Sequence, residues 1–242
     1  FDKDGTLTNS ESYLTKIANH RIKETIKILE NNLHEIDLAR LNNLLKSVYG
    51  ITSLSLDPHG AIAIASRNEN LISTATLICT LLKNWPKAIH FANEIFLAAD
   101  IAISKESNEI NKRPLLPGVK NLLKRLNSAK ITCALITNDN NKGIEEFLEV
   151  NGLTNKFNGY WSCENHPKKP DPNAVKEFCK KLNLKPSECL LIGDSDSDLK
   201  MARLAGIGMS IGYTSGWTIT PELKFQQEII NDWDELTCLK KD

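Results

Sequence analysis

The chain has 242 residues, and its 30 Lys and Arg residues balance 30 Asp and Glu residues, so the formal net charge at pH 7 is zero. This length allows one large domain or two smaller ones, each able to bury a core. The balanced charge gives no reason to expect a nucleic acid or an anionic membrane as a partner. The most apolar window, residues 71–82, is shorter than the roughly 20 residues of a membrane span and predicts a core helix.

The six cysteines form no Cys-x-x-Cys pair, and several lie inside apolar runs. This pattern predicts reduced, buried thiols and makes a cytoplasmic location the default expectation. The chain opens on Phe1, without an initiator Met and directly before a turn that contains glycine. We therefore expect residues upstream of Phe1 to be missing, so the absence of a visible leader says little about targeting.

The segment from residue 10 to residue 108 is predicted to be all-helical, because its apolar residues recur at helical spacing and no convincing alternating strand is present. The clearest runs are Ile17, Ile22, Ile26 and Leu29, and then Leu38, Leu41, Leu44, Leu45 and Val48. Pro86 suits the first turn of a further helix, where a proline loses no helical hydrogen bond.

From residue 114 onward, short apolar runs alternate with amphipathic segments, which is typical of βα units and a parallel sheet. The predicted strands span residues 131–137, 188–193 and 207–213. The predicted helices span residues 116–126, 140–150, 172–182 and 197–205. Ligands of such sheets bind beyond the carboxyl ends of the strands, so polar residues at those ends are the candidate functional residues.

The first candidate cluster holds Asp2 and Asp4, two residues apart and followed by Gly5, which lets the backbone turn away. A carboxylate is nucleophilic at neutral pH without losing a proton and can attack phosphorus to give an aspartyl-phosphate. A second carboxyl group two residues further on can protonate the leaving oxygen and later deprotonate water. Taken alone, this cluster also fits an ordinary surface turn.

Three further polar clusters follow along the chain. Thr137 and Asn138 come after a predicted strand and can donate hydrogen bonds to a phosphoryl oxygen, although both also suit a helix cap. Lys168 and Lys169 can neutralise charge on a nucleophile and a phosphate, or form a solvated basic turn. The acidic turn at residues 194–198 suits a hard cation such as Mg²⁺, and also suits the start of a helix.

With these four clusters in this order, the chain resembles the haloacid dehalogenase-like hydrolase superfamily, in its phosphoglycolate phosphatase and β-phosphoglucomutase-like branch, over most of its length. The resemblance implies that Asp2 is the nucleophile and Asp4 the acid/base. It implies that Lys169, rather than Lys168, is the lysine of the site, because the lysine of the family directly precedes a proline. It implies phosphate binding by Thr137, Asn138 and Lys169, and Mg²⁺ binding by Asp2, Asp4 (through its carbonyl), Asp194 and Asp198.

The resemblance also implies an α/β fold, with a Rossmann-like parallel sheet core and an inserted all-helical cap domain. The core is expected at residues 1–9 and 109–242, and the cap at residues 10–108. Residues 228–236 resemble the ending of capped members, with an edge strand and then a helix. The first strand, of which only Phe1 remains, is expected at the centre of the sheet.

The activity implied by the resemblance is Mg²⁺-dependent hydrolysis of a small phosphorylated metabolite through an aspartyl-phosphate. Asp4 argues against dehalogenation, and Thr6 after Gly5 favours hydrolysis over mutase chemistry. A sugar phosphomutase of the same fold, or a non-catalytic scaffold that binds a phosphometabolite or a protein, remains an alternative. Arg67 is a candidate for substrate contact from the cap. Neither the substrate nor the oligomeric state follows from the sequence.

Overall fold

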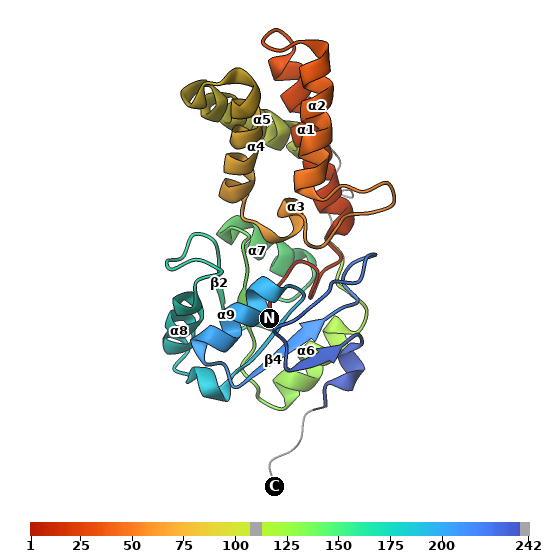
Figure 1. Cartoon of the computed structure of the whole chain (residues 1–242). Coiled ribbons are helices and arrows are strands. Elements are labelled where there is room, and N and C mark those ends of the chain that lie inside the picture. The colour runs from red at the N-terminus through yellow and green to blue at the C-terminus, as the bar shows by residue number, and fades with distance from the viewer. Residues whose placement is uncertain (107–112, 238–242) are drawn as a thin grey trace. The chain divides into compact units, whose positions relative to one another are not determined.

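The computed structural model describes residues 1–106 and 113–237 and divides into two compact units (Figure 1). The sheet unit consists of Phe1–Ser10 and Arg113–Asp242, and the helical unit consists of Glu11–Lys112. The helical unit is therefore an insertion into the sheet unit. The expected second domain boundary, between residues 108 and 109, lies outside the described residues.

The helical unit is built from the helices that its apolar periodicity predicts. They are α1 (Glu11–Leu29), α2 (Glu35–Tyr49), α3 (Ala61–Ile64), α4 (Arg67–Leu82) and α5 (Trp85–Ser104). A capping box starts α4: the Ser66 hydroxyl accepts from the Glu69 amide, and the Glu69 carboxylate accepts from the Ser66 amide. Asn84 caps α5, and Pro86 lies in its first turn as predicted. No helix in the described ranges is long and apolar enough to cross a membrane.

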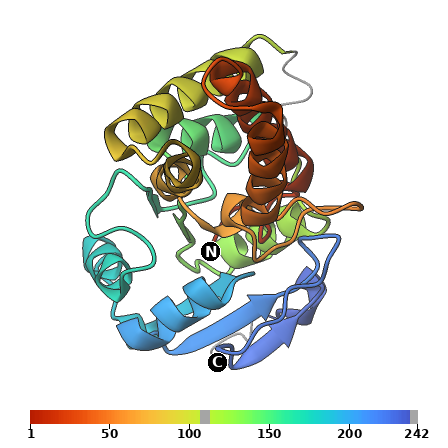
Figure 2. The same cartoon turned by 45° about the horizontal axis from the view of Figure 1, so that its top comes forward.

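The sheet unit alternates strands with helices, as its sequence pattern predicts. Its strands are β1 (Ala134–Ile136), β2 (Gly159–Trp161), β3 (Leu190–Gly193), β4 (Met209–Tyr213) and β5 (Glu228–Ile230). Its helices are α6 (Val119–Ser128), α7 (Asn141–Val150), α8 (Pro172–Lys181) and α9 (Asp196–Ala205), with short 3₁₀ turns η1 (Pro186–Glu188) and η2 (Trp233–Glu235). β1 pairs with β2, and β4 lies between β3 and β5 (Figure 2). Every one of these pairings is parallel.

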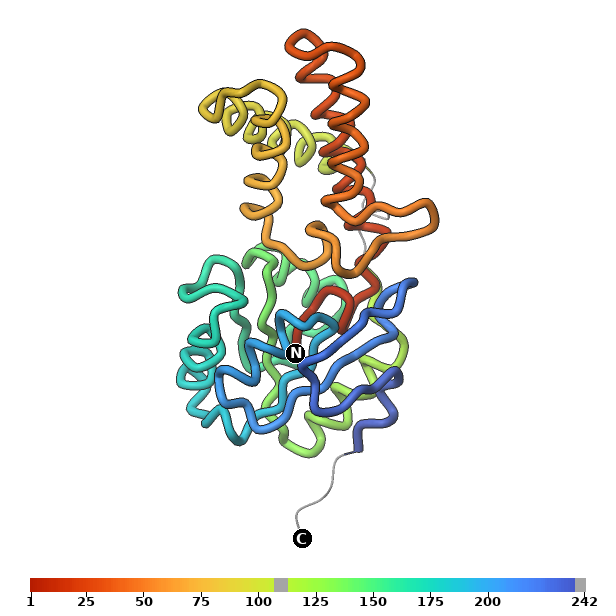
Figure 3. Tube along the Cα trace, in the orientation of Figure 1, coloured from red at the N-terminus to blue at the C-terminus, as the bar shows by residue number. Residues whose placement is uncertain are grey.

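The first two residues join the two sheets. The amide of Ile136 donates to the carbonyl of Phe1 at 2.9 Å, and the amide of Asp2 donates to the carbonyl of Ile192 at 2.9 Å. The start of the chain therefore lies between β1 and β3, inside the sheet unit (Figure 3). This is the central position that the family resemblance implies for the first strand.

Alternate residues of the strands face two different apolar cores, as the period of a strand requires. Leu135 and Ile192 belong to one core, which contains residues of α6 and α7. Ile136 and Leu191 belong to the other, which contains residues of α8 and α9. The sheet unit is therefore a sheet with helices on both faces, the arrangement predicted for parallel strands.

Several predicted elements differ from the structure in their bounds. The strands predicted at residues 131–137 and 207–213 are the shorter Ala134–Ile136 and Met209–Tyr213, and the helix predicted at residues 116–126 is Val119–Ser128. β2 was not predicted, because a three-residue strand shows no period of its own. The strand predicted to start at residue 188 starts at Leu190, since residues 186–188 form a 3₁₀ turn. The helix predicted near the end of the chain is only the 3₁₀ turn Trp233–Glu235, which carries Trp233 into the core.

Candidate active site

Three candidate residues follow directly after the strand segments at one edge of the sheet. Asp2 ends the segment between β1 and β3, Thr137 follows β1, and Asp194 follows β3. Because parallel strands end at a common edge, residues far apart in the sequence meet there. The edge is therefore the place where the predicted chemistry can assemble.

The turn after Asp2 depends on Gly5. The amides of Leu7 and Thr8 both donate to the carbonyl of Lys3, at 2.9 and 3.1 Å, and this closes a tight turn. Gly5 has a φ of 77° in this turn, in the left-handed region that residues with a Cβ rarely adopt. The turn holds the Thr6 hydroxyl against Asp194, where it donates to Oδ1 at 2.8 Å.

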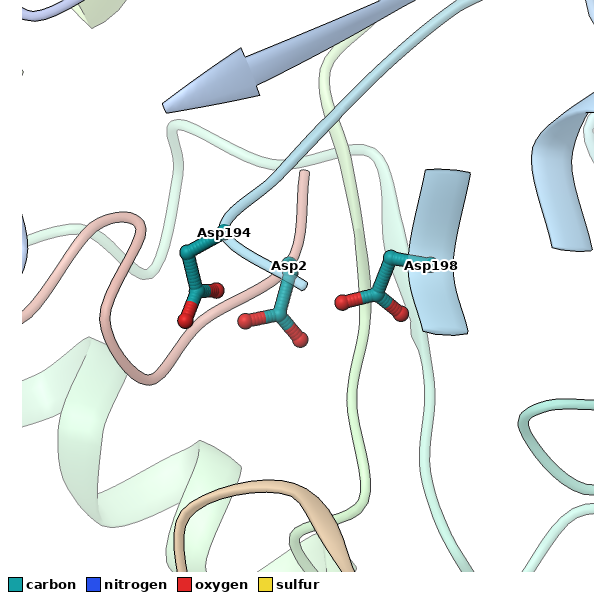
Figure 4. Close-up of side chains that lie close together, drawn as sticks. All are labelled: Asp2, Asp194 and Asp198. Carbon is teal, nitrogen blue, oxygen red and sulfur yellow. The ribbon is translucent and has the colours of Figure 1, made fainter. Parts of the chain in front are cut away.

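Asp2, Asp194 and Asp198 form a buried group of three carboxylates (Figure 4). Each offers an oxygen within 4.8 Å of those of the other two. Asp198 reaches the group from the first turn of α9, which begins where the Ser195 hydroxyl accepts from the Asp198 amide. Carboxylate oxygens are among the hard ligands that suit Mg²⁺, and three carboxylates converge here.

Lys169 is the cation of this group. Its ammonium lies 2.6 Å from Asp2 Oδ1 and 2.6 Å from Asp198 Oδ1, and it donates to the carbonyl of Ile136 at 3.3 Å. The Lys169 side chain is 5% exposed. One lysine against three carboxylates leaves an excess of negative charge, so the described residues fit a divalent cation.

The pKa values follow from this burial and charge. Burial raises the pKa of Asp2 to about 6, Lys169 opposes that rise, and Asp198 adds to it. Burial, then Asp2 and Asp198, raise the pKa of Asp194 well above its usual range. Burial alone would lower the pKa of Lys169, but Asp198 and Asp2 overcome it and raise the pKa. Without a metal, the protein holds these carboxylates at a cost that a bound cation would relieve.

Asp4 lies outside this group of three and belongs to a second charged cluster. The Lys3 ammonium lies 2.7 Å from Asp4 Oδ2 and 3.0 Å from Asp139 Oδ2, and Arg113 lies 2.8 Å from Asp139 and 3.7 Å from Asp4. The Ser10 hydroxyl also donates to Asp4. Burial opposes ionisation of Asp4, but Lys3 and Arg113 outweigh it and hold its pKa well below the usual range.

The remaining predicted residues lie next to these two clusters. Thr137 is buried, and its hydroxyl accepts from the Asp139 amide at 3.2 Å. Asn138 follows it and is half-buried. Lys168, the weaker candidate, is exposed, whereas Lys169 contacts Asp2. Arg67 pairs with Asp100 at 2.6 Å inside the helical unit, and its contact with a substrate stays a prediction.

Several site residues were missed by sequence reasoning. Lys3 and Arg113 each pair with both Asp4 and Asp139, and Trp217 donates from its indole Nε1 to Asp194 Oδ2 at 2.6 Å. A lysine between two predicted catalytic aspartates was an available signal for Lys3. No sequence signal indicated Trp217.

Comparison with known proteins gives the family. Residues 1–206 match the model of the haloacid dehalogenase-like hydrolases. The phosphoglycolate phosphatase of Vibrio vulnificus YJ016 is 36% identical over 110 residues, which are 44% of this chain and 48% of that protein. That of Vibrio parahaemolyticus is 37% identical over the same shares. The matched region thus spans about half the length of these curated relatives.

Solved structures share the fold. A predicted phosphoglycolate phosphatase of Haemophilus somnus superimposes with a TM-score of 0.67 at 22% identity, covering 97% of this chain and 93% of that one. A family IA hydrolase of Entamoeba histolytica does so with a TM-score of 0.60 at 21% identity, covering 98% and 93%. These matches confirm the predicted fold class. The chain belongs to the haloacid dehalogenase-like hydrolase family.

Proposed function

We propose that this chain is a Mg²⁺-dependent phosphatase that hydrolyses a small phosphate monoester through an aspartyl-phosphate on Asp2. The observation that carries the proposal is the buried group of Asp2, Asp194 and Asp198 with Lys169 as its one ion-pair partner among the described residues. Phosphoglycolate is the first substrate to test, because the curated relatives that match are phosphoglycolate phosphatases. We also propose that the helical unit is the substrate-selecting cap.

The metal would be held by Asp2, Asp194 and Asp198, together with the carbonyl of Asp4. When bound, Mg²⁺ supplies positive charge that stabilises negative charge developing on the phosphoryl oxygens. The excess of carboxylates over lysines supports this assignment, since isolated buried carboxylates are costly without a cation.

In the first step, an oxygen of Asp2 attacks phosphorus, and the bond from phosphorus to the leaving oxygen breaks. Lys169 holds Asp2 at 2.6 Å and offsets the repulsion between the carboxylate and the phosphate. Thr137 and Asn138 donate to the phosphoryl oxygens, where charge spreads in the transition state.

Asp4 carries the proton between the two steps. It gives a proton to the leaving alkoxide, and then takes a proton from the water that attacks the phosphorus of the aspartyl-phosphate. This second attack releases phosphate and restores both Asp2 and Asp4. The ionised state that Lys3 and Arg113 favour in Asp4 suits the second step, whereas the first step needs Asp4 to gain a proton.

The test is phosphate release from a panel of monoesters that includes phosphoglycolate and hexose phosphates, with and without Mg²⁺. Asp2→Asn is expected to reduce release to the level without enzyme while keeping the fold. Asp171→Asn is the matched control, because Asp171 is exposed and caps α8, a role that Asn also fills. Retained activity in Asp2→Asn would contradict the proposal, and a hexose phosphate isomer in place of free phosphate would indicate a mutase.

A further inference from the structure

The loop after β4 reaches into the group of carboxylates. Trp217 lies in this loop, and its indole Nε1 donates to Asp194 Oδ2 at 2.6 Å. The Thr6 hydroxyl donates to the other oxygen, Oδ1, at 2.8 Å. Trp217 and Asp194 are each only 7% exposed, and Thr6 is fully buried. Two donors from segments far apart in the sequence thus fix both oxygens of one carboxylate.

Two glycines make this contact possible. A Cβ on Gly5 would lie 2.3 Å from Trp217 Nε1 and 2.4 Å from Asp194 Oδ2. A Cβ on Gly216 would lie 1.6 Å from the carbonyl oxygen of Gly5. Any side chain at either position would push the loop away from the turn. Because neither glycine has a side chain, the loop can approach the turn closely, and the Trp217 indole can reach Asp194.

The charge of the donors matters as much as their position. Lys169 pairs with Asp2 and Asp198, but no Lys, Arg or His in the described part of the chain lies within ion-pair distance of Asp194. Both donors to Asp194 are neutral. A neutral donor fixes the orientation of a carboxylate without cancelling its charge, whereas a lysine there would compete with a cation. Outer donors of this kind orient metal ligands in other proteins.

We propose that Trp217 is a positioning residue of the metal site, which holds Asp194 in one orientation and leaves its negative charge available to Mg²⁺. This inference rests on the proposed function, since it assumes that the carboxylates bind Mg²⁺. It adds Trp217, from the loop after β4, to a site otherwise formed by Asp2, Lys169, Asp194 and Asp198.

The test is calorimetric Mg²⁺ binding to the metal-free protein and to Trp217→Phe, which keeps an aromatic ring and removes the N–H donor. Loss of an outer donor typically weakens metal binding by about 10–100-fold, and that is the expected loss. Activity at saturating Mg²⁺ should recover most of its wild-type value, because a positioning residue acts through the metal. Trp233→Phe is the control, since Trp233 is also buried in the same unit and stacks on Tyr213 away from the three carboxylates.

The outcomes separate the two proposals. If the wild type binds no Mg²⁺, the proposed function fails. If the wild type binds Mg²⁺ and Trp217→Phe binds it equally well, only the role of Trp217 fails. A second measurement needs no folded variant: in wild-type protein labelled with fluorotryptophan, Mg²⁺ should shift the fluorine resonance of the indole that touches Asp194. If no indole resonance responds while calorimetry detects binding, the role of Trp217 is refuted.

Discussion

Replacing Lys169 with Met tests how the charges of the site are balanced. Met keeps the apolar stem but removes the ammonium that lies 2.6 Å from both Asp2 and Asp198. Both carboxylates then remain buried beside Asp194 without a cation. Removing one partner of a buried ion pair typically costs about 3–5 kcal/mol, because the remaining charge is left in a poor environment.

Protonation limits this loss. A carboxyl group with a pKa of roughly 3.9 in the unfolded chain can take up a proton at pH 7 for about 4 kcal/mol. The metal-free variant can therefore lose no more than about that amount for each carboxylate that it protonates. We expect Lys169→Met to lower the free energy of unfolding at pH 7 by about 3–4 kcal/mol.

The stability loss of Lys169→Met should depend on pH in a direction that can be measured. The pKa of Asp2 is raised to about 6 in the folded protein, so the folded state binds a proton more readily than the unfolded chain. Stability from this group therefore falls as the pH rises from about 4 to 6, and is constant above. Lys169 lowers this pKa, so the pKa of Asp2 is higher in the variant. The pH range over which the free energy of unfolding falls therefore extends to higher pH. The difference in free energy of unfolding between the wild type and the variant should thus be smaller at pH 5.5 than at pH 7.

The assay is urea unfolding in EDTA at both pH values. Lys168→Met is the matched control, because Lys168 is the exposed neighbour and such surface changes typically stay within about 0.5 kcal/mol. A loss below about 1 kcal/mol for Lys169→Met at pH 7, or a deficit that does not shrink at pH 5.5, would refute the charge balance described here.

Three further outcomes are expected. Gly5→Ala should lower the free energy of unfolding in urea by at least about 2 kcal/mol and should weaken Mg²⁺ binding. The reason is that Gly5 has a φ of 77° and that a Cβ there would lie 2.3 Å from Trp217; unchanged Mg²⁺ binding would contradict this. Lys3→Met should lose about 3 kcal/mol, since Asp4 and Asp139 would share Arg113 alone; wild-type stability would show that Lys3 is dispensable. Mg²⁺ at 100 times its dissociation constant should raise stability by about 2.7 kcal/mol over EDTA in a melting assay, and no shift would argue against a metal site.

The elements that sequence predicts well are those with local signals. Gly206 ends α9 in a left-handed conformation directly after the predicted last residue, and Asn84 with Pro86 marks the start of α5. β2 is different, because its three residues are fixed by pairing with β1 and by packing of Trp161, which no local pattern reveals.

The site divides in the same way. Asp194 could be placed from the sequence because it follows a strand, and the ends of parallel strands converge. Asp2 could be placed from the two aspartates that precede Gly5. Trp217 could not, since its contact with Asp194 depends on the path of a loop and on the close approach of Gly216 to Gly5. The charged cluster around Asp4 depends on Arg113, which enters the sheet unit only after the inserted helical unit.

The most direct test of the central claim is to trap the intermediate. Wild-type protein with Mg²⁺ is mixed with an active monoester, quenched in acid within one turnover, and digested for mass spectrometry. The account predicts a phosphoryl group on the peptide that contains Asp2, and none in Asp2→Asn. Turnover by the wild type with no phosphorylated peptide, or with the phosphoryl group on another residue, would contradict it.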